Sequence, residues 1–520
     1  MRTLLILLSL LAISSTLIRA QLVDQTTTPN LANEGIKKSL ADQIGAGRGD
    51  LDTPGSSRYI IARDPFRAIR RGRQLFQRKF TREQGQGPVT GDASGDIASD
   101  LSIGAGLADS CAACHARPRG AAGFGGAVVT RPDSRDAPHL FGLGLKEMLA
   151  DEMTQQLRAS RDAAMNQAME TGQEVRRELR AKGVDFGRIR AFSDGTVDTS
   201  GVEGVDDDLR VRPFFAHGGT ISIREFVVGA LNAEMGLETA DPDLAAAVGG
   251  QIVVTPAGMT LEPGDNIEAP PASSALDDPD DDGVVNEIDP ALIDHMEFYF
   301  LNYFKPGLDR QTRRTREGRQ HMRRVGCTNC HVPSLRIEQD RRVADVETAF
   351  DPRQGIFNNL FATASPLFVE VNDGQAETLK QPVGGTFTVE RIYTDFKRHD
   401  LGPNFHEIEF DGNLRTEFLT MPLWGVGTTA PYGHDGRSTT LRNVILRHGG
   451  EARRSREQFE RLRPQQQDAI IAHLQSLTLF PPDDTASNLN PGDANAPDFP
   501  QRGHGSINLG ALFNDPSDPE

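Results

Sequence analysis

Two stretches of this 520-residue chain have the composition or the apolar spacing of helices. Residues 143–190 are rich in Ala, Met, Glu and Arg and contain few helix breakers, which predicts one long helix or a helical hairpin. Residues 467–479 predict a closing helix, with apolar positions at Ile470, Ile471, Leu474 and Leu477. His473 on that helix is expected to be a core or surface residue rather than a metal ligand. The pattern therefore predicts a mainly α protein.

One helical segment occurs twice. Gly72–Phe76 (GRQLF) and Gly318–Met322 (GRQHM) both lie in stretches of helical composition, which indicates the same opening helix used twice. Each precedes a Cys-x-x-Cys-His motif, and the first is separated from it by a Gly/Ser/Asp-rich insertion, residues 83–109, which predicts a loop. Residues 21–57 and 481–520 are rich in Pro, Asp, Asn and Thr and are expected to form little of the core.

The N-terminus predicts export. Arg2 precedes an uncharged apolar run, Thr3–Ile18, followed by Arg19–Gln21, which has the layout of a secretory signal peptide with cleavage after Ala20. No later apolar stretch is long enough to span a bilayer, so the mature protein is expected to be soluble, exported and periplasmic, and not membrane-spanning. A membrane-anchoring first helix, the alternative, would need a longer apolar span.

Length and charge limit the possible partners. A chain of this length can build two substantial cores. The formal net charge of −17 argues against nucleic acid as a partner. Two arginine-rich runs, residues 310–324 and 453–463, stand out against that acidity. We expect them to be solvated helix faces, with docking of an acidic redox partner as the alternative.

All four cysteines lie in two Cys-x-x-Cys-His motifs, Cys111–His115 and Cys327–His331. Two thiols one helical turn apart can each form a thioether with a vinyl group of one porphyrin, while the adjacent imidazole reaches the iron. A zinc site would gather the four thiols, and a redox motif does not explain a following histidine twice. The sequence therefore predicts two covalently bound haem c groups, with His115 and His331 as proximal iron ligands. The attaching thiols are Cys111, Cys114, Cys327 and Cys330.

A separate acidic segment, residues 278–289, has the layout of a calcium-binding loop. Its candidate Ca²⁺ ligands are Asp278, Asp280, Asp282, Val284, Asn286 and Asp289. Asp289 stands where glutamate is usual, and Pro270 and Pro271 exclude the usual entering helix, so only an exiting helix is expected, over residues 290–304. The alternative is an acidic turn that caps that helix.

Three further motifs carry a family resemblance. Thr420–Gly425 (TMPLWG), Ala430–Arg437 (APYGHDGR) and His448–Ala452 (HGGEA) resemble the bacterial dihaem cytochrome c peroxidases, in particular the branch of dihaem oxidoreductases, also called thiol oxidoreductases. Residues 393–402 are similar to the tyrosine-aspartate and HDMG-type stretches of that branch, with Leu401 in place of the methionine. The resemblance covers most of residues 60–480.

The resemblance implies a mainly α fold with two cytochrome c-like haem domains and long insertions and extensions. The implied segments are a signal peptide, an N-terminal extension, two haem domains and a flexible tail, at residues 1–20, 21–57, 58–276, 277–482 and 483–520. In the family, one haem is an electron-transfer centre with two protein ligands.

His448 occupies the place of that haem's distal ligand, where relatives also have methionine or tyrosine. Imidazole in place of thioether should lower the potential. The alternative is that His448 satisfies the end carbonyls of a helix. His434 is expected to be a buried hydrogen-bonding residue beside the same haem.

The first haem is implied to be the reactive one. In the peroxidases its distal pocket holds an amide and an acid, and Glu225 and Glu234 match these two positions, with a carboxylate in place of the amide. A positioned glutamate can carry the proton that peroxide loses from one oxygen and gains on the other. The alternative places both acids on the wet face of an amphipathic helix. His217 would cap the iron or line the pocket, and His139 is a weaker candidate for the sixth position.

The resemblance thus implies a dihaem c-type oxidoreductase, an enzyme that reduces hydrogen peroxide at the N-terminal haem. Electrons would come from a small redox protein through the C-terminal haem. One alternative is oxidation or oxygenation of a protein or organic substrate, as in the methylamine dehydrogenase maturation enzyme and rubber oxygenase relatives. The other is a dihaem electron-transfer protein without peroxidase activity. Calcium between the haem domains is also a family feature, although its motif is not the loop found here.

Overall fold

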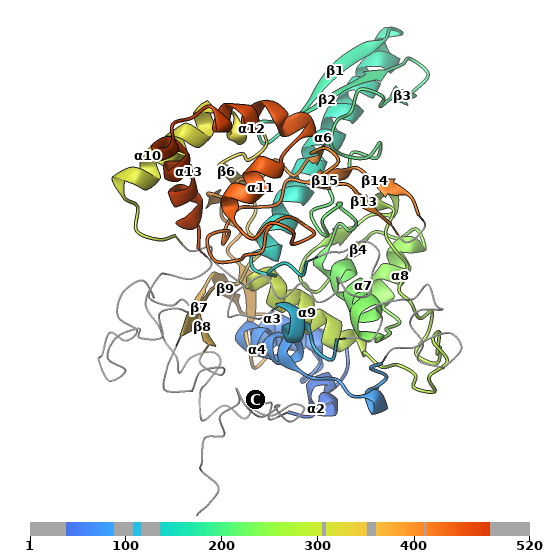
Figure 1. The fold of residues 1–520 in the computed structure, drawn as a ribbon. Coiled ribbons are helices and arrows are strands. Elements are labelled where there is room, and N and C mark those ends of the chain that lie inside the picture. Colours follow the sequence, from blue (N-terminus) through green and yellow to red (C-terminus); the bar gives the residue numbers. More distant parts are fainter. Residues whose placement is uncertain are drawn as a thin grey trace, which may run out of the picture.

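The computed structural model contains helices and short antiparallel strand pairs (Figure 1). It describes residues 38–87, 108–115, 136–303, 308–350, 360–409 and 412–478. The predicted signal peptide, the flexible tail and much of the 83–109 insertion lie outside the described residues. Helix is the more common element, which confirms the helical part of the predicted fold class; the two cytochrome c-like domains stay a prediction.

The elements follow one another along the chain as helical and strand-rich stretches. The helices are α2 (Leu40–Ile44), α3 (Ser57–Arg63), α4 (Pro65–Gln77), α5 (Cys111–His115), α6 (Leu143–Thr171), α7 (Ile223–Met235), α8 (Pro242–Val248), α9 (Pro290–Asn302), α10 (Arg313–Arg324), α11 (Leu441–Arg447), α12 (Arg453–Glu460) and α13 (Pro464–Gln475). The strands are β1 (Val175–Ala181), β2 (Val184–Ala191), β3 (Val197–Asp198), β4 (Val253–Val254), β5 (Thr260–Leu261), β6 (Ser334–Ile337), β7 (Ala344–Phe350), β8 (Leu360–Pro366), β9 (Phe368–Val371), β10 (Leu379–Pro382), β11 (Phe387–Glu390), β12 (Arg398–Asp400), β13 (Glu407–Ile408), β14 (Leu414–Arg415) and β15 (Glu417–Leu419).

Two helix crossings repeat the same close contact. α4 crosses α9, and a methyl group on Gly72 would collide with the backbone carbonyl of His295. α10 crosses α13, and a methyl group on Gly318 would collide with the carbonyl of Ala469. These are the glycines of the two GRQ segments. The predicted reuse of one opening helix is therefore matched by the same glycine contact in both crossings, and the predicted closing helix, α13, is confirmed.

The apolar side chains form a larger and a smaller core. The larger core joins α3, α4, α6, α7 and α9 to β1, β2, β6 and β7. The smaller core lies between α10, α11, α12 and α13. Cys111 packs against the larger core and Cys327 against the smaller one. α9, β6 and β7, which follow residue 277 in the chain, belong to the larger core, and the predicted domain border at residue 277 stays a prediction.

The prediction of helix through residues 143–190 is wrong beyond α6. The helix ends at Thr171, where Gly172 adopts φ 69°, and the chain continues as the β1–β2 hairpin, which projects as an arm in Figure 1. Exposed and buried positions alternate along both strands. Lys182 and Gly183, both with positive φ, form the two-residue turn that such hairpins favour.

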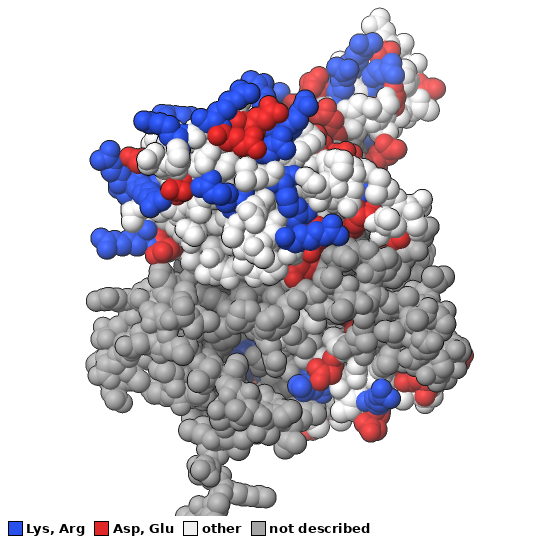
Figure 2. Space-filling model, viewed as in Figure 1, with Lys and Arg blue, Asp and Glu red and all other residues white. Residues whose placement is uncertain are grey.

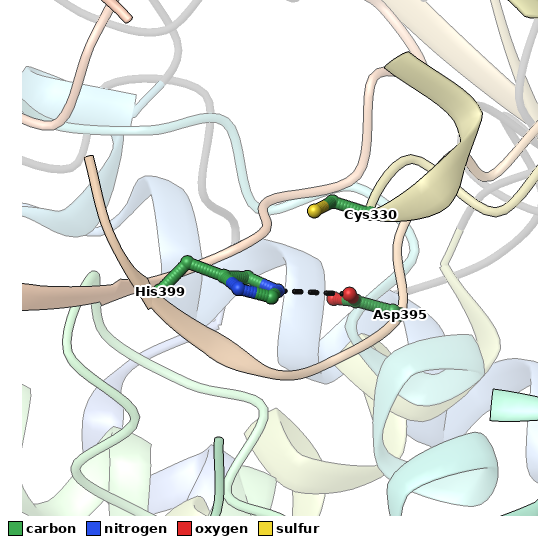
Figure 3. Close-up of side chains that lie close together, drawn as sticks. All are labelled: Cys330, Asp395 and His399. Atoms are coloured by element: carbon green, nitrogen blue, oxygen red, sulfur yellow. Dashed lines mark hydrogen bonds and ion pairs between the residues drawn. The ribbon is translucent and has the colours of Figure 1, made fainter. Parts of the chain in front are cut away.

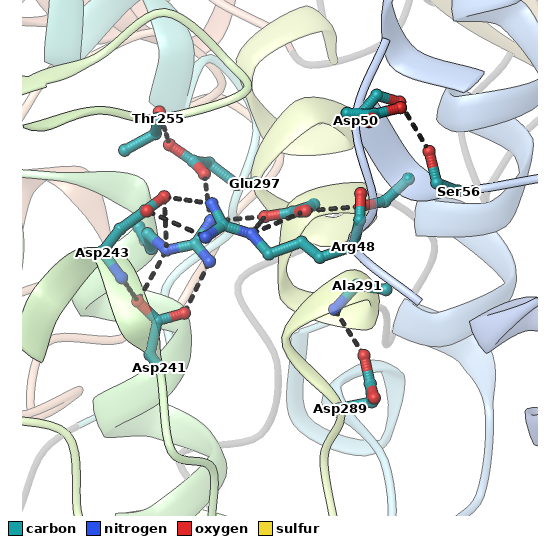
Figure 4. A network of polar contacts seen from close by, with 12 residues as sticks. Arg48, Asp50, Ser56, Asp241, Asp243, Thr255, Asp289, Ala291 and Glu297 are labelled. Carbon is teal, nitrogen blue, oxygen red and sulfur yellow. Dashed lines mark hydrogen bonds and ion pairs between the residues drawn. The ribbon is translucent and has the colours of Figure 1, made fainter. Parts of the chain in front are cut away.

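A buried ionic network ties the N-terminal segment to the larger core (Figure 4). Arg224, which is fully buried, bonds Asp241 at 2.6 Å, Asp294 at 2.8 Å and Glu297 at 2.9 Å. Arg48, from the predicted N-terminal extension, bonds Asp294 from the other side at 3.1 Å. Removing one partner from such a network leaves an uncompensated buried charge. Residues just before the predicted haem domain are therefore part of the folded structure.

Candidate functional site

The first Cys-x-x-Cys-His motif forms the short helix α5, which places Cys111 and Cys114 one turn apart. The Nδ1 atom of His115 donates to the backbone carbonyl of Pro138 at 2.6 Å. Burial lowers the pKa of His115, so its imidazole is neutral near pH 7. A neutral ring whose Nδ1–H is bonded to a carbonyl keeps the lone pair on Nε2, which is the form that ligates a metal.

The second motif follows directly from α10. A 3₁₀ turn over Cys327–Asn329 replaces the short helix of the first motif. The Nδ1 atom of His331 donates to the carbonyl of Tyr393 at 3.1 Å, and burial lowers the pKa of His331. Tyr393 is itself held by a 2.8 Å hydrogen bond between its hydroxyl and Nε2 of His473. His473 is fully buried in this role, as a core residue.

His448 stands at the C-terminal end of α11. Its Nδ1 atom donates to the carbonyl of Val444 at 2.7 Å, so the alternative role of binding a helix-end carbonyl is fulfilled. That bond still leaves Nε2 for a metal. Burial lowers the pKa of His448 to about 4, and the charge of His331 acts in the same direction. The role of His448 as the second protein ligand of the second iron stays a prediction.

These observations test whether the residues fit two haem c groups. His115, His331 and His448 each use Nδ1 on a backbone carbonyl, and each leaves Nε2 for the iron. No disulfide joins the four cysteines, so each side chain is available for a thioether bond. The donor set of both motifs therefore fits the group that the sequence predicts.

An unforeseen cluster lies beside the second motif (Figure 3). Ligand atoms of Cys330, Asp395 and His399 all lie within 4.8 Å of one another. His399 is bonded through Nε2 to Asp395 at 2.9 Å and through Nδ1 to Glu451 at 2.7 Å. Burial opposes protonation, but the bonds to Asp395 and Cys330 prevail and raise the pKa of His399 to about 11. Cys330 can serve a metal ion with this pair or a porphyrin, not both.

Sequence reasoning used Asp395 and His399 only as parts of family-like stretches and assigned them no role. Their only signal was the i, i+4 spacing of an acid and a histidine.

Glu234 lies beside the first motif. Its backbone carbonyl accepts from the amide of Ala108 at 3.1 Å. Burial raises the pKa of Cys114, and the charges of Glu234 and Asp109 raise it further, so both carboxylates are near that thiol. Glu234 is half-buried at the end of α7.

Glu225 is occupied by the backbone. Its two carboxylate oxygens accept from the amides of Ile221 at 2.9 Å and Glu268 at 3.1 Å, and its side chain is buried. The wet-face alternative is therefore wrong for Glu225. The two hydrogen bonds from backbone amides favour a structural role for Glu225, which leaves Glu234 as the candidate for proton transfer.

The remaining predicted histidines lie in different surroundings. His139 is close to His115, because it directly follows Pro138, whose carbonyl accepts from Nδ1 of His115. Burial and the charge of Lys146 lower the pKa of His139 to about 3. Its buried Nδ1 has no hydrogen-bond partner within the described part of the chain. His217 stacks on Phe215 with ring centroids 6.1 Å apart, in a turn bonded to β15. His434 stacks on Phe418 with ring centroids 4.0 Å apart, and its Nε2 lies 3.2 Å from a carboxylate oxygen of Glu407.

The calcium-like loop brings together part of the predicted ligand set. Oxygen atoms of Asp278, Asp280 and Asp282 lie within 4.8 Å of one another. Asp289 instead caps α9, accepting from the amide of Ala291 at 2.8 Å, which is the role that the alternative gave it. Asn286 is exposed, and the amide of Val284 donates to Asp282 at 2.7 Å.

Two glutamates that sequence reasoning missed lie behind this loop. Burial and the charges of the three aspartates raise the pKa of Glu238 to about 7. Burial and the charges of Asp280, Asp282 and Glu238 raise that of Glu287 to about 9. Glu238 and Glu287 are 7% and 6% exposed. This concentration of negative charge favours a bound cation.

Comparisons with known proteins identify a family that part of this chain resembles. Residues 340–477 match the model of a family described as "Di-haem oxidoreductase, putative peroxidase". The matched region contains His399 and His448 and excludes both Cys-x-x-Cys-His motifs. The match confirms the resemblance to the dihaem oxidoreductase branch, a family that implies haem as the cofactor and oxidoreductase chemistry.

Other comparisons add little. A chain of Kuenenia stuttgartiensis hydrazine synthase pressurized with 20 bar xenon is similar at 15% identity and a TM-score of 0.22, over 36% of this chain and 55% of that one. This chain thus spans about half the length of that one. At such a TM-score the likeness carries no argument. No curated protein matches the chain. Within the described residues, no helix has both the length and the apolar character needed to cross a membrane.

Proposed function

We propose that this protein is an exported, periplasmic dihaem c-type oxidoreductase. It reduces hydrogen peroxide at the haem of Cys111–His115, with electrons from a small redox protein entering through the haem of Cys327–His331. The observation that carries the proposal is the shared state of His115, His331 and His448, which are neutral, bonded through Nδ1 to a carbonyl and open at Nε2.

Each residue has a defined task in this proposal. When bound, the haems supply one-electron redox chemistry and, at the first motif, an iron that binds peroxide. His331 and His448 would be the protein ligands of the second iron. Glu234 moves a proton between the two oxygens of peroxide. The α4–α9 crossing packs in the larger core and the α10–α13 crossing in the smaller one, and each would frame one haem.

A test of these ligand assignments is available in the spectrum of the oxidised holoprotein. Electron paramagnetic resonance should show a low-spin signal from the second haem, with two imidazole ligands, and a high-spin signal from an open first haem. Because His448 is assigned to the second iron, His448→Ala should change the low-spin signal and shift the potential of that haem, while peroxide binding is kept. His434→Ala is the matched control and should leave both signals in place. A His448→Ala protein with an unchanged low-spin signal would refute the assignment.

A second function is favoured by one observation. His139 lies close to His115, and its Nδ1 atom is buried without a hydrogen bond among the described residues. A second histidine on the first iron would close its sixth position and make the protein an electron carrier. In that case the high-spin signal is absent from wild type and appears in His139→Ala.

We also propose that Asp278, Asp280 and Asp282 bind one Ca²⁺, with Glu238 and Glu287 behind them. Carboxylate oxygens are the ligands that Ca²⁺ prefers, and the cation would offset the repulsion that raises these pKa values. The double variant Asp280→Ala/Asp282→Ala should lose one tightly held Ca²⁺ in elemental analysis. Asp281→Ala, an exposed position in the same loop, is the control. Equal calcium content in wild type, the double variant and the control would show that the loop is an acidic turn that binds no Ca²⁺.

The effect of calcium on stability should depend on pH. The folded-state pKa values of Asp280, at about 6, and Glu238, at about 7, are above those of the unfolded chain. The calcium-free folded protein therefore holds extra protons at low pH, and its stability falls as pH rises through these values. Calcium must displace those protons, so it binds better at higher pH. The rise in Tm on adding calcium should be larger at pH 8 than at pH 6, and an equal rise would contradict the assignment.

A further inference from the structure

The two arginine-rich runs form one exposed region over the smaller core. α10 and α13 cross, and the start of α12 approaches the end of α10, because a side chain on Gly326 would lie 3.0 Å from Oγ of Ser455. Figure 2 shows Lys and Arg gathered over these helices. We call this region the basic face. Its exposed arginines are Arg310, Arg313, Arg314, Arg316, Arg319, Arg323, Arg324, Arg453, Arg454, Arg461 and Arg463.

The charge of the basic face is only partly neutralised by the protein itself. Arg313 pairs with Glu317 at 2.8 Å, and Arg461 is 4.0 Å from Glu457. No carboxylate of the described chain lies within ion-pair distance of a second group of arginines, which are Arg319, Arg323, Arg324, Arg453 and Arg454. The net charge of −17 means that acidic residues outnumber basic ones in this chain, yet none in the described part of the chain pairs with these arginines.

The basic face adjoins the second haem motif. α10 ends at Arg324, and the motif begins at Cys327. Burial raises the pKa of Tyr393, and the charges of Arg319 and Arg323 oppose that rise, so both guanidinium groups lie near this tyrosine. The carbonyl of Tyr393 accepts from His331, the proposed iron ligand. The unpaired positive charge therefore lies within a few side chains of the proposed second haem.

The positive charge of the basic face acts at long range. A negatively charged protein would be attracted to this face, beside the second motif. Attraction of this kind raises association rates by about 10 to 10³ and is screened by salt.

We infer that the basic face is the docking surface for the electron donor and that the donor is a small acidic redox protein. The inference rests on the proposed function, because it names the partner that reduces the second haem. Long-range steering toward Arg319, Arg323 and Arg324 would orient the donor over the motif that receives its electron. One electron passes from the donor to the second haem, so the donor is oxidised and the haem reduced.

The test is the rate at which a reduced acidic monohaem cytochrome c reduces the oxidised holoprotein, followed by stopped-flow absorbance. The same cytochrome with amidated carboxylates is the second probe. The triple variant Arg319→Glu/Arg323→Glu/Arg324→Glu should react with the acidic probe at least about 10-fold more slowly at low ionic strength. Its rate should also lose the steep fall with salt that wild type shows. The amidated probe should react slowly with wild type.

The matched control makes the same charge change on the β1–β2 arm. Arg176, Arg180 and Arg188 are exposed there, and their reversal to Glu should leave the rate with the acidic probe unchanged. Three glutamates introduced near the C-terminal end of α10 would interact unfavourably with the helix dipole, so the variant Arg319→Gln/Arg323→Gln/Arg324→Gln is made as well. This variant should slow the reaction with the acidic probe by a smaller factor, with unchanged Tm and haem spectrum.

A neutral reductant separates this inference from the proposed function. Hydroquinone should reduce wild type and the triple variants equally. If hydroquinone-driven peroxide turnover is absent, the proposed enzyme fails, while the docking rates can still be read. If turnover is intact but neither triple variant slows the acidic cytochrome, the docking surface is overturned. Binding of wild type but not the variants to phosphatidylglycerol vesicles, with no effect on donor rates, would assign the face to a membrane instead.

Discussion

Replacing Glu234 by glutamine is expected to slow the reaction with hydrogen peroxide by about 10² to 10⁴-fold, the contribution typical of a general acid–base group. Glutamine keeps the size of the side chain and removes the exchangeable carboxyl proton. Glu234 lies near Cys114 and is half-buried, so its carboxylate is close to the motif that would hold the first haem. Stopped-flow absorbance with peroxide measures the change, and intact mass should show both haems still attached.

Asp109→Asn provides the control for this variant. Asp109 also acts on Cys114, but it pairs with Lys79 at 3.2 Å, so its carboxylate is engaged by a surface cation. The same change from carboxylate to amide should leave the rate unaltered there. If wild type does not react with peroxide at all, the electron-carrier function replaces the enzyme. If wild type reacts and Glu234→Gln is equally fast, the placement of the distal acid is wrong and the enzyme stands.

The intact mass of the exported protein should exceed that of the processed chain by two haems. Because each haem needs the thiols of its own motif, Cys111→Ala and Cys327→Ala should each disrupt one attachment and leave the other motif loaded. The separate packing of Cys111 on the larger core and Cys327 on the smaller core supports independent loading. Mass spectrometry of the purified variants gives the result directly.

Asp395→Asn distinguishes haem attachment from the competing metal site at Cys330. With Cys330 in a thioether, this variant should retain both haems, because Asp395 forms no bond to the porphyrin in the proposal. If the cluster of Cys330, Asp395 and His399 holds an ion, wild type should contain zinc or another divalent metal and Asp395→Asn should lose it. Free thiols, a disulfide or zinc in the wild-type protein would end the haem interpretation.

The helices that sequence predicts correctly are those with a clear apolar stripe or a repeated motif, such as α13 and the pair α4 and α10. The β1–β2 arm was missed because its composition, rich in Arg, Glu and Ala, favours helix. The structure shows a hairpin there, with exposed and buried positions that alternate along the strands and a turn at Lys182 and Gly183. The other strands are short, and their pairing is set by contacts between distant segments, which one sequence does not display.

Some residues of the candidate site can be predicted from local sequence, and others cannot. Spacing alone identified His115 and His331, because the covalent chemistry of haem attachment requires adjacent cysteines and histidine. Their carbonyl partners, Pro138 and Tyr393, are separated from them by 23 and 62 positions, so no local pattern could reveal them. Glu238 was likewise invisible, since it approaches the acidic loop only through folding.

The two glycine crossings bear on how this chain is assembled from simpler parts. Their helices occur in the order α4, α9, α10, α13, so the first pair is complete before the second begins. Neither pair is threaded through the other, and residues 303–312 connect them. Such an order is what tandem copying of a single ancestral module would leave behind. The extra length of the first copy comes largely from the material between α5 and α9, which includes the β1–β2 arm, whereas the connection between the two pairs is short.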